Sequence, residues 1–333
     1  ISVEKALSII KRNTNNTLSS EKIKPECSLG RITSENVYSA IDNPSFNMSA
    51  MDGYAVCDNP SNGIYKVIDE TFAGKPTTKK ISKGEAIRVF TGSKLPEGAK
   101  AVIIQEDIKK LNNQLIFNTN KRVKIGSYVR KQGLDFKKNK IIISKNKEIN
   151  ARDIALLIGA NVKHVKVYKK PKISLLASGD ELIISRNKKK EGRVFASSMF
   201  MLEALINISG SKCIYKKIIK DNKKIIKNEL KKATNSDLII TTGGVSVGNK
   251  DLIRSSLKEL GYEEKFWKIM MKPGKPFLFS ILKGTPVFSL PGNPVSSYVC
   301  FCIFVIPFLK KLFNINKQLD KRNAKLENSL MPS

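Results

Sequence analysis

Short apolar runs separated by turn residues fill the first half of the chain. Between Ser39 and Lys145, runs such as GYAVCD, EAIRVFTG and IIIS are broken by Gly, Pro and Asn residues. This spacing is typical of short strands and predicts a compact β-rich module. Before that module, Val3, Leu7 and Ile10 fall on one face of a short amphipathic helix.

The pattern changes after Asn150. The apolar runs ISLLAS, LIITT and VFSL are separated by helix-like segments such as SSMFMLEALINIS and DNKKIIKNELKKAT. This alternation predicts an α/β domain with a mostly parallel sheet and crossover helices. Segment 166–172, KVYKKPK, is the predicted hinge between the two halves. The apolar stretch Val295–Leu309 is shorter than the about twenty residues of a membrane span, so it predicts a buried core helix.

Composition narrows the class of protein. The 333 residues include 60 Lys and Arg against 29 Asp and Glu, a net charge of +31, and 41% are hydrophobic. The apolar fraction supports a folded chain of several domains. A basic chain suits phosphate binding, but no helix-turn-helix, zinc-finger or RNA-binding signature accompanies the charge. We therefore expect anionic small molecules as ligands, and neither a nucleic acid nor a membrane as partner.

Cysteine and histidine limit the possible chemistry. Cysteines stand at positions 27, 57, 213, 300 and 302 without a C-x-x-C pair, which fits a reducing, cytoplasmic location better than a disulfide framework or a zinc ribbon. His164 is the only histidine, so one chain cannot supply a metal site with two His ligands. A bound metal would therefore be a hard ion held by oxygen atoms.

Polar loops follow the strands of the second half, where ligands of open α/β sheets bind. The acidic pair after ISLLA suits either Mg²⁺ or the N-terminus of the next helix. The run TTGGVSVGNKD suits contact between backbone N–H groups and an anion, with a tight structural turn as the alternative. It is not a Walker A loop, because Asn249 occupies the position that requires Lys. The candidate residues of these two loops are Ser178, Gly179, Asp180, Glu181, Gly243, Gly244, Ser246, Gly248 and Asp251.

Two proline-stiffened loops complete this set. The segment SLPGNPVSS forms a stiff turn before the long apolar helix. In MKPGKP, two lysines on a fixed backbone suit a phosphate or oxyanion, although lysines that are merely exposed are the alternative. The candidate residues of these loops are Lys272, Pro273, Gly274, Lys275, Pro291, Gly292, Asn293 and Pro294. In the β-rich half, Asp52 and Thr91 stand at predicted turns, where an Asx-turn explains Asp52 equally well.

Taken together, these motifs resemble one known family. NPSFNMSAMDGYAV, FTGSKLPEGAKAVIIQED, LASGDEL, TTGGVSVGNKD, MKPGKPF and SLPGNPVSS occur in the order found in the molybdopterin molybdenumtransferases, which include the C-terminal domain of gephyrin. Members of that family insert molybdate into adenylylated molybdopterin and release AMP with the help of a divalent cation. The resemblance implies Mg²⁺ as cofactor, and adenylylated molybdopterin and molybdate as ligands. It also implies a homodimer with its sites at the subunit junction, and the molybdopterin adenylyltransferase as a partner.

The resemblance further implies roles for individual residues. Glu181 and Asp251, helped by Asp180, would hold Mg²⁺ against the diphosphate. Lysines, Thr91 and the turns containing Pro291 and Pro294 would position molybdate and phosphate, and Asp52 would reach the site from the dimer partner. The implied catalytic residues are Asp52, Thr91, Asp135, Glu181, Asp221, Asp251, Lys268, Lys272 and Lys275.

The resemblance divides the chain into five segments. They are an N-terminal helix packing on the α/β domain (1–18), a linking α+β domain (19–38 and 132–168), a β-rich domain (39–131), a three-layer molybdopterin-binding α/β domain (169–315), and the start of a C-terminal β-barrel domain that we expect to be truncated (316–333). The chain departs from the family at Ala196-Ser197-Ser198, where the family ends this triplet in Asn. That departure puts pterin contacts near Ser198 in doubt.

Several functions stay open at this point. The principal acids favour the transferase, while the Ala196 and Ser198 departures and the expected truncation favour a homologue with decayed activity or a molybdopterin-binding scaffold. The related family that adenylylates molybdopterin shares the TTGG and PGNP loops, but the MDGYAV segment and the β-rich half argue against it. The basic charge leaves a nucleic-acid-associated protein as a remote alternative.

Overall fold

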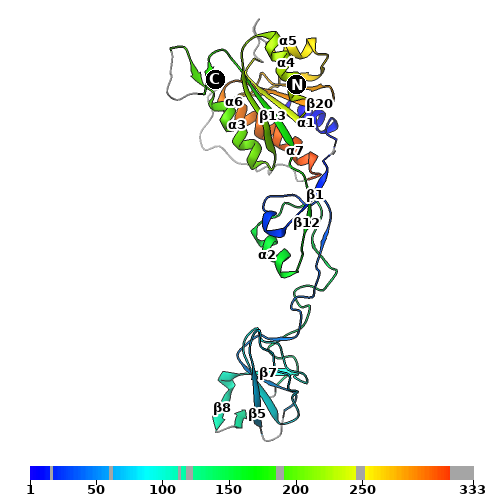
Figure 1. The fold of residues 1–333 in the computed structure, drawn as a ribbon, viewed down its shortest axis with the longest axis vertical. Coiled ribbons are helices and arrows are strands. Elements are labelled where there is room, and N and C mark those ends of the chain that lie inside the picture. Colours follow the sequence, from blue (N-terminus) through cyan, green and yellow to red (C-terminus); the bar gives the residue numbers. More distant parts are fainter. Residues whose placement is uncertain are drawn as a thin grey trace.

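The computed structural model describes residues 1–15, 18–59, 63–111, 114–117, 123–184, 191–244 and 252–315. Figure 1 shows an elongated molecule made of three parts. We call them the β-rich region (β3 to β10), the linking region (β1, β2, β11, β12 and α2) and the α/β region (α1 and the elements from β13 onward). The linking region lies between the other two, which occupy opposite ends of the molecule (Figure 1).

The β-rich region is built on a six-stranded sheet with the order β7-β4-β6-β5-β9-β8. Its strands are β4 (Gly53–Val56), β5 (Ile64–Thr71), β6 (Glu85–Val89), β7 (Ala101–Ile104), β8 (Ile108–Leu111) and β9 (Gln114–Phe117), with a 3-10 turn at Gln105–Asp107 and a small ladder of β3 (Met48–Ser49) and β10 (Val129–Arg130). Because successive side chains of a strand point to opposite faces, Tyr54 and Val56 join one apolar cluster and Ala55 joins another. The predicted β-rich module is confirmed.

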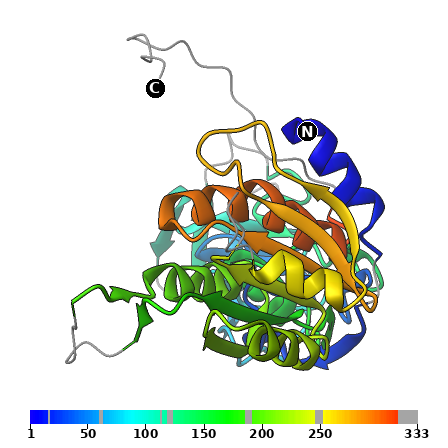
Figure 2. The same ribbon diagram turned by 90° about the horizontal axis from the view of Figure 1, so that it is seen from above.

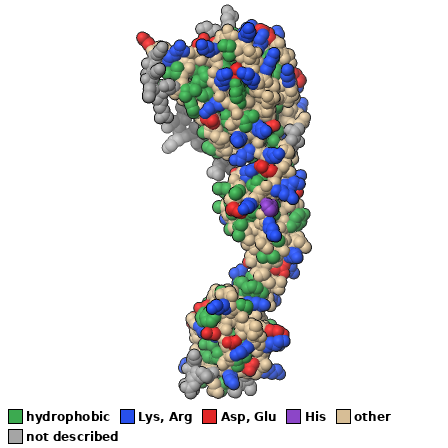
Figure 3. Space-filling view, in the orientation of Figure 1, with side chains coloured by type: hydrophobic (Ala, Val, Ile, Leu, Met, Phe, Trp, Pro, Cys, Tyr) green, Lys and Arg blue, Asp and Glu red, His purple; other side chains and the backbone are tan. Residues whose placement is uncertain are grey.

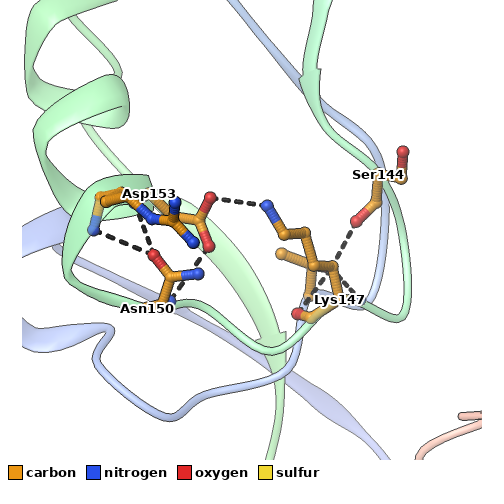
Figure 4. A network of polar contacts seen from close by, with 6 residues as sticks. Ser144, Lys147, Asn150 and Asp153 are labelled. Carbon is orange, nitrogen blue, oxygen red and sulfur yellow. Dashed lines mark hydrogen bonds and ion pairs between the residues drawn. The ribbon is translucent and has the colours of Figure 1, made fainter.

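The linking region consists of short antiparallel ladders and one helix. Strand β1 (Ser20–Ile23) pairs with β12 (Val165–Tyr168), and β2 (Val37–Tyr38) pairs with β11 (Ile141–Ile143), while a 3-10 turn (Pro25–Cys27) and helix α2 (Ala151–Gly159) complete the region. Figure 4 shows how helix α2 begins: the Asn150 side chain accepts from the Asp153 N–H at 3.1 Å, and the Asp153 carboxylate accepts from the Asn150 N–H at 3.0 Å. Lys147 Nζ donates to the same carboxylate at 2.6 Å. This capping box fixes the helix start.

The pattern-based grouping of one run was wrong, and the predicted hinge overlaps a strand. The IIIS run was grouped by its pattern with the β-rich module, but its strand β11 pairs with β2 in the linking region. The predicted hinge 166–172 begins inside strand β12, which pairs over its full length with β1. Both partners are more than 100 residues away in sequence, and a local pattern carries no information about such pairing.

The α/β region contains a second six-stranded sheet, with the order β16-β13-β17-β20-β19-β18. The first four strands of this order are parallel, and β19 and β18 are antiparallel additions at one edge. The strands are β13 (Lys172–Ser178), β16 (Lys212–Ile219), β17 (Leu238–Thr242), β18 (Glu263–Trp267), β19 (Leu278–Leu282) and β20 (Thr285–Leu290), with a separate parallel pair of β14 (Leu182–Ile183) and β15 (Val194–Phe195). The predicted mostly parallel sheet is confirmed.

Helices cover both faces of this sheet, so the region has three layers (Figure 2). The helices are α1 (Val3–Arg12), α3 (Ser197–Ile208), α4 (Lys223–Ala233), α5 (Leu252–Glu259), α6 (Pro294–Cys300), a π-helical turn (Phe301–Val305) and α7 (Ile306–Leu312). Helices α1, α3, α6 and α7 pack on the face that carries Leu175 and Ile240, and α4 and α5 pack on the face that carries Leu176 and Ile239. The central strands β13, β17 and β20 are therefore buried on both sides, which explains their continuous apolar runs.

The apolar helix that ends the described chain belongs to the core. Among the described residues, Pro294–Leu312 is the one helical stretch whose length and composition would suffice to cross a membrane. Its residues Phe301, Phe304 and Phe308 are fully buried in the main apolar cluster of the α/β region. The prediction of a core helix is confirmed.

A buried carboxylate joins helix α4 to strand β16. Glu229 accepts hydrogen bonds from the Tyr215 hydroxyl and from the ammonium groups of Lys217 (3.0 Å) and Lys232 (3.1 Å). Burial by itself would raise the pKa of Glu229, but the three hydrogen bonds outweigh it and lower that pKa to about 2.

We expect Glu229→Gln to lower the free energy of unfolding by about 1–3 kcal/mol at pH 7, because an amide cannot satisfy the same charged donors. Since the folded-state pKa is depressed, the contribution is present above the ordinary value of 4.5 and is lost as the pH falls toward about 2. Urea unfolding followed by the fluorescence of Trp267, the only tryptophan, measures this difference. A difference that does not shrink over this pH range contradicts the assignment.

Candidate active site

The parallel strands of the α/β region end at one edge of the sheet. Ala177 of β13 pairs with Thr242 of β17, and Thr242 pairs with Leu290 of β20, so the loops that follow these strands start side by side. Strands β16 and β17 lie on either side of β13, which makes this edge the topological switch point of the sheet. The predicted convergence of the glycine- and proline-rich loops is confirmed for their described residues.

Glycines allow these loops to touch. Gly243 has a φ of +81°, and a Cβ there would lie 2.4 Å from the carbonyl oxygen of Ser178. Gly244 has a φ of +65°, and its Cβ would lie 2.8 Å from Cγ1 of Ile253. A Cβ on Gly292 would lie 3.5 Å from Cα of Gly243. A side chain at Gly243 or Gly244 would therefore collide with Ser178 or Ile253, while Gly292 lies at ordinary van der Waals distance from Gly243.

Carboxylates gather on the β13 and β16 side of this edge. The Ser178 hydroxyl donates to Oδ1 of Asp221 at 2.7 Å, and the Asp221 N–H donates to Oδ1 of Asp180 at 3.2 Å. The Glu181 carboxylate folds over Gly179, within 2.6 Å of the position where a Cβ would stand. Four of the predicted site residues, together with Gly179, thus lie around one loop.

Hydroxyl groups fix the β20 loop. The Pro291 carbonyl accepts from Thr242 Oγ1 at 2.9 Å and from Ser297 Oγ at 2.5 Å. The Gly292 carbonyl accepts from Ser198 Oγ at 3.0 Å. The sequence interpretation missed these anchoring roles, although the second Thr of TTGG and the Ser residues of PVSS were visible in the sequence.

Asn293 and Pro294 begin helix α6. The Asn293 side chain accepts from the Ser296 N–H at 3.2 Å, which makes Asn293 the N-cap, and Pro294 occupies the first helical position. The sequence motif PGNP therefore has a structural purpose independent of any ligand.

The lysine-bearing loop lies at the same edge. It joins β18 to β19, and Leu278 at the start of β19 pairs with Trp267 of β18 on one side and with Ser289 of β20 on the other. Lys272 and Lys275 are exposed in this loop. Gly274 is buried and approaches Cys300 of helix α6, so closely that a Cβ would stand 2.8 Å from the sulfur.

Lys268 is held beside an indole ring. Its backbone is left-handed, with a φ of +65°, and its Nζ lies 4.0 Å from the centroid of the Trp267 ring. The guanidinium of Arg254 lies 3.8 Å from the same centroid and forms two hydrogen bonds with the Glu264 carboxylate. Trp267 therefore connects Lys268 to helix α5, which follows the TTGG loop. Sequence reasoning identified Lys268 but did not identify Trp267 as part of this site.

Asp52 and Thr91 form a pair of their own in the β-rich region. Oδ1 of Asp52 accepts from both the N–H and the hydroxyl of Thr91, each at 2.8 Å. The backbone bond first, the hydroxyl bond second and then the charge of Arg88 favour the ionised carboxylate and hold the Asp52 pKa below its ordinary value. Within one chain, the β-rich region that carries this pair lies at the opposite end of the molecule from the α/β region (Figure 1).

Asp135 also lies apart from the sheet edge. Its carboxylate pairs with Arg130 at 2.9 Å, and Asn43 Nδ2 donates to it at 3.4 Å. The described structure therefore brings the α/β candidates together and leaves Asp52, Thr91 and Asp135 elsewhere on the chain.

The structure describes only some of the predicted metal-binding and loop residues. Asp180 and Glu181 are described, whereas Ser246, Gly248 and Asp251 lie outside the described residues. Within the described ranges, no group of three or more His, Cys, Asp or Glu side chains is arranged to hold a metal ion. The donors present are all carboxylate and hydroxyl oxygens, whose chemistry fits a hard divalent cation.

An apolar groove of about 720 Å³ lies next to this cluster along the chain. Its lining residues come from β14, β15 and the start of α3, and are Ile183, Ile184, Phe195, Ala196, Ser197 and Phe200. The groove is large enough for a ring system of drug-like size.

Comparison with protein families gives two matches that cover most of the chain. Residues 1–160 match the MoeA N-terminal region (domain I and II), and residues 174–311 match a probable molybdopterin binding domain.

Individual relatives agree with these matches. A molybdopterin molybdenumtransferase of Haemophilus influenzae is 34% identical over 285 residues, which is 85% of this chain and 70% of that protein. One from Nostoc is 33% identical over 301 residues, covering 86% and 68%. The crystal structure of a molybdopterin biosynthesis MoeA protein from Pyrococcus horikoshii aligns with a TM-score of 0.81 at 33% identity, covering 95% of this chain and 81% of that one.

We expect Gly243→Ala to destabilise the protein more than Gly261→Ala. Both glycines have positive φ, +81° and +75°, but a Cβ on Gly261 meets nothing within 4 Å. The conformational cost of about 1–2 kcal/mol is shared, and the collision with Ser178 adds about 1–3 kcal/mol at Gly243 alone. Urea unfolding monitored by Trp267 fluorescence compares the two variants. Equal losses contradict the close approach of the loops.

Proposed function

Because the chain belongs to the MoeA family, which includes the molybdopterin molybdenumtransferases, we propose that it inserts molybdate into adenylylated molybdopterin and releases AMP. In the overall reaction, Mo–O bonds of molybdate are exchanged for Mo–S bonds to the substrate dithiolene, and the displaced oxygens leave as water. Water also cleaves the diphosphate bond, which releases AMP and leaves the phosphate on the molybdopterin. A site for this reaction has to hold a diphosphate, a second anion and a pterin ring system at once.

The order of charges along the sheet edge supports this proposal most directly. The loops of β16 and β13 present carboxylates, the loops of β17 and β20 present glycine-rich backbone, and the loop before β19 presents lysines. Neighbouring strands are about 4.8 Å apart, so the edge from β13 to β19 spans about 15 Å. One end of this edge suits a metal-bound diphosphate, and the other suits an oxyanion.

Mg²⁺ fits the acidic end. Asp180 and Glu181 would hold the ion together with Asp251, and the ion would neutralise charge on the diphosphate when bound. Asp221 keeps the loop in place through its bonds with Ser178 and Asp180. The backbone N–H groups at Gly243 and Gly244, with Ser246 and Gly248 beyond them, would contact phosphate oxygens.

The other end provides cations on a rigid support. Lys268, Lys272 and Lys275 would bind molybdate, whose two negative charges they complement. The buried Gly274 and its contact with Cys300 hold the lysine loop against helix α6. The apolar groove beside Ser197 would take the pterin, whose ring is planar and largely apolar on its faces.

A second chain would supply the remaining acids. The β-rich region that carries Asp52 and Thr91 lies at the opposite end of the molecule from the α/β region (Figure 1), so these side chains would reach a sheet edge from the second chain of a homodimer. We propose such a dimer, working in the cytoplasm, with Asp135 supporting the junction and the molybdopterin adenylyltransferase delivering the substrate.

A molybdopterin-binding scaffold is the second candidate. The Ser198 hydroxyl, at the position where the family has Asn, donates to Gly292 instead of facing a ligand. A scaffold would bind adenylylated molybdopterin without releasing AMP.

Purified protein supplied with adenylylated molybdopterin, Mg²⁺ and molybdate is expected to release AMP. Glu181→Gln and Asp251→Asn should each lower the rate at least 100-fold, because removal of a metal ligand weakens binding of the ion. Glu259→Gln, which removes a surface carboxylate paired with two lysines on helix α4, is the matched control and should leave the rate unchanged. The measurement is the AMP released per minute.

The same assay tests the dimer. Asp52→Ala and Glu181→Gln chains are each inactive alone, and mixing them should restore part of the activity, because one junction of the mixed dimer is intact. Binding of the substrate without AMP release in the wild type selects the scaffold. Full activity of both acid variants refutes the site.

Titration with molybdate alone should change the fluorescence of Trp267 in a saturable way. This indole is the only tryptophan and lies 4.0 Å from Lys268 Nζ, so an anion that draws the ammonium group away changes its surroundings. Lys268→Ala should abolish the change. Lys283→Ala removes the same charge from the turn at the opposite end of β19 and should respond like the wild type. An unchanged response in Lys268→Ala removes Lys268 from the anion site.

A further inference from the structure

One face of the β-rich sheet carries an arginine among aromatic rings. Register across the strands places Tyr54 of β4 opposite Arg88 of β6, and Arg88 beside Glu70 of β5. Residues paired in this way point to the same face of a sheet. The three side chains therefore form one row across three strands.

A second row follows two residues further along the strands. Phe72 and Phe90 stack with their centroids 4.8 Å apart and their planes at 12°. Because Gly53 pairs with Val89, Asp52 stands opposite Phe90 and completes this row. The Arg88 face, defined by Tyr54, Glu70, Arg88, Phe72 and Phe90, thus borders the Asp52–Thr91 pair.

The Arg88 guanidinium is held in a fixed plane. Its Cζ lies 4.7 Å from the Tyr54 ring centroid and 5.2 Å from that of Phe90, and Nη2 donates to Oε1 of Gln105 at 2.6 Å. These contacts are with rings and an amide, which orient the group without neutralising its charge. A guanidinium fixed in this way offers a flat face on which another ring can stack.

A groove of about 520 Å³ opens over this face, within the range of small-molecule sites. Its lining includes Tyr54, Arg88 and Phe90 together with two carboxylates, Asp69 and Glu70. The Thr77 hydroxyl donates to Asp69 at 2.5 Å, whereas Glu70 is exposed at the groove. Carboxylates on the wall repel a phosphate and accept hydrogen bonds from an amino group.

We propose that this groove binds an amino-substituted planar heteroaromatic ring, of the kind found in adenine and in pterins. The ring stacks on Arg88 and Phe90, and its exocyclic amino group donates to Glu70. The choice of ring rests on the proposed function, because adenylylated molybdopterin contains both kinds. The groove would hold one end of that substrate beside Asp52.

Adenosine and free pterin test the proposal without any phosphate or molybdate. Calorimetric titration of the full chain with each compound should show saturable binding of at least one. Arg88→Ala and Arg88→Lys should weaken that binding about tenfold, because both remove the stacking plane. Glu70→Gln replaces an exposed side chain and should weaken it severalfold. Lys83→Ala, an exposed cation of the same region, is the control and should bind like the wild type.

The outcomes separate the two proposals. Adenosine binding that the Arg88 variants weaken identifies the base of the AMP half as the occupant. Pterin binding that these variants weaken places the pterin in this groove and not in the groove beside Ser197. If neither compound binds, or if the Arg88 and Glu70 variants bind as the wild type does, the groove is not a ring site, whatever the AMP assay shows. If a ring compound binds and the wild-type protein releases no AMP, the groove is a ring-binding site and the transferase proposal is refuted.

Discussion

The arrangement of the α/β region depends on one close contact, the approach of Gly243 to the carbonyl of Ser178. This contact brings the loop after β17 over the end of β13. The Gly243 N–H in turn bonds to the Leu290 carbonyl, which draws in the end of β20. Hydroxyls of Thr242 and Ser297 then fix the next carbonyl, that of Pro291. Because each step uses backbone or a short side chain, contacts within the protein itself hold the described parts of these loops together.

The loops at this sheet edge carry different chemical groups. The β13 and β16 loops carry the acids, and the loop before β19 carries the lysines, while the glycine loops between them contribute backbone. Trp267 links the lysine loop to helix α5, which follows the TTGG loop, because Lys268 and Arg254 of helix α5 both lie against its ring. A shift of the helix that follows the TTGG loop would therefore be felt at Lys268.

The sequence predicted the parts of this structure that depend on local patterns. Apolar strands alternating with helical segments indicated a mostly parallel sheet, and the polar loops after the strands indicated where a ligand would bind. The local pattern did not indicate pairing between distant segments, as the cases of β11 and β12 show, and only the family resemblance grouped 19–38 with 132–168. The Arg88 face was missed for the same reason, since its row exists only through the register of β4, β5 and β6. Ser198 was identified as a departure, but its bond to Gly292 needs the folded loop.

The surroundings of the carboxylates separate structural acids from candidate ligands. In this basic chain, whose Lys and Arg side chains are scattered over all three regions on the face shown in Figure 3, structural acids are neutralised by lysines, as Glu229 and Asp153 are. At the sheet edge the partners differ, because Asp221 accepts from a hydroxyl and Asp180 from a backbone N–H. Such neutral donors orient a carboxylate without cancelling its charge. Within a field that is positive overall, the acids at this edge therefore retain the charge that binding of a divalent cation requires.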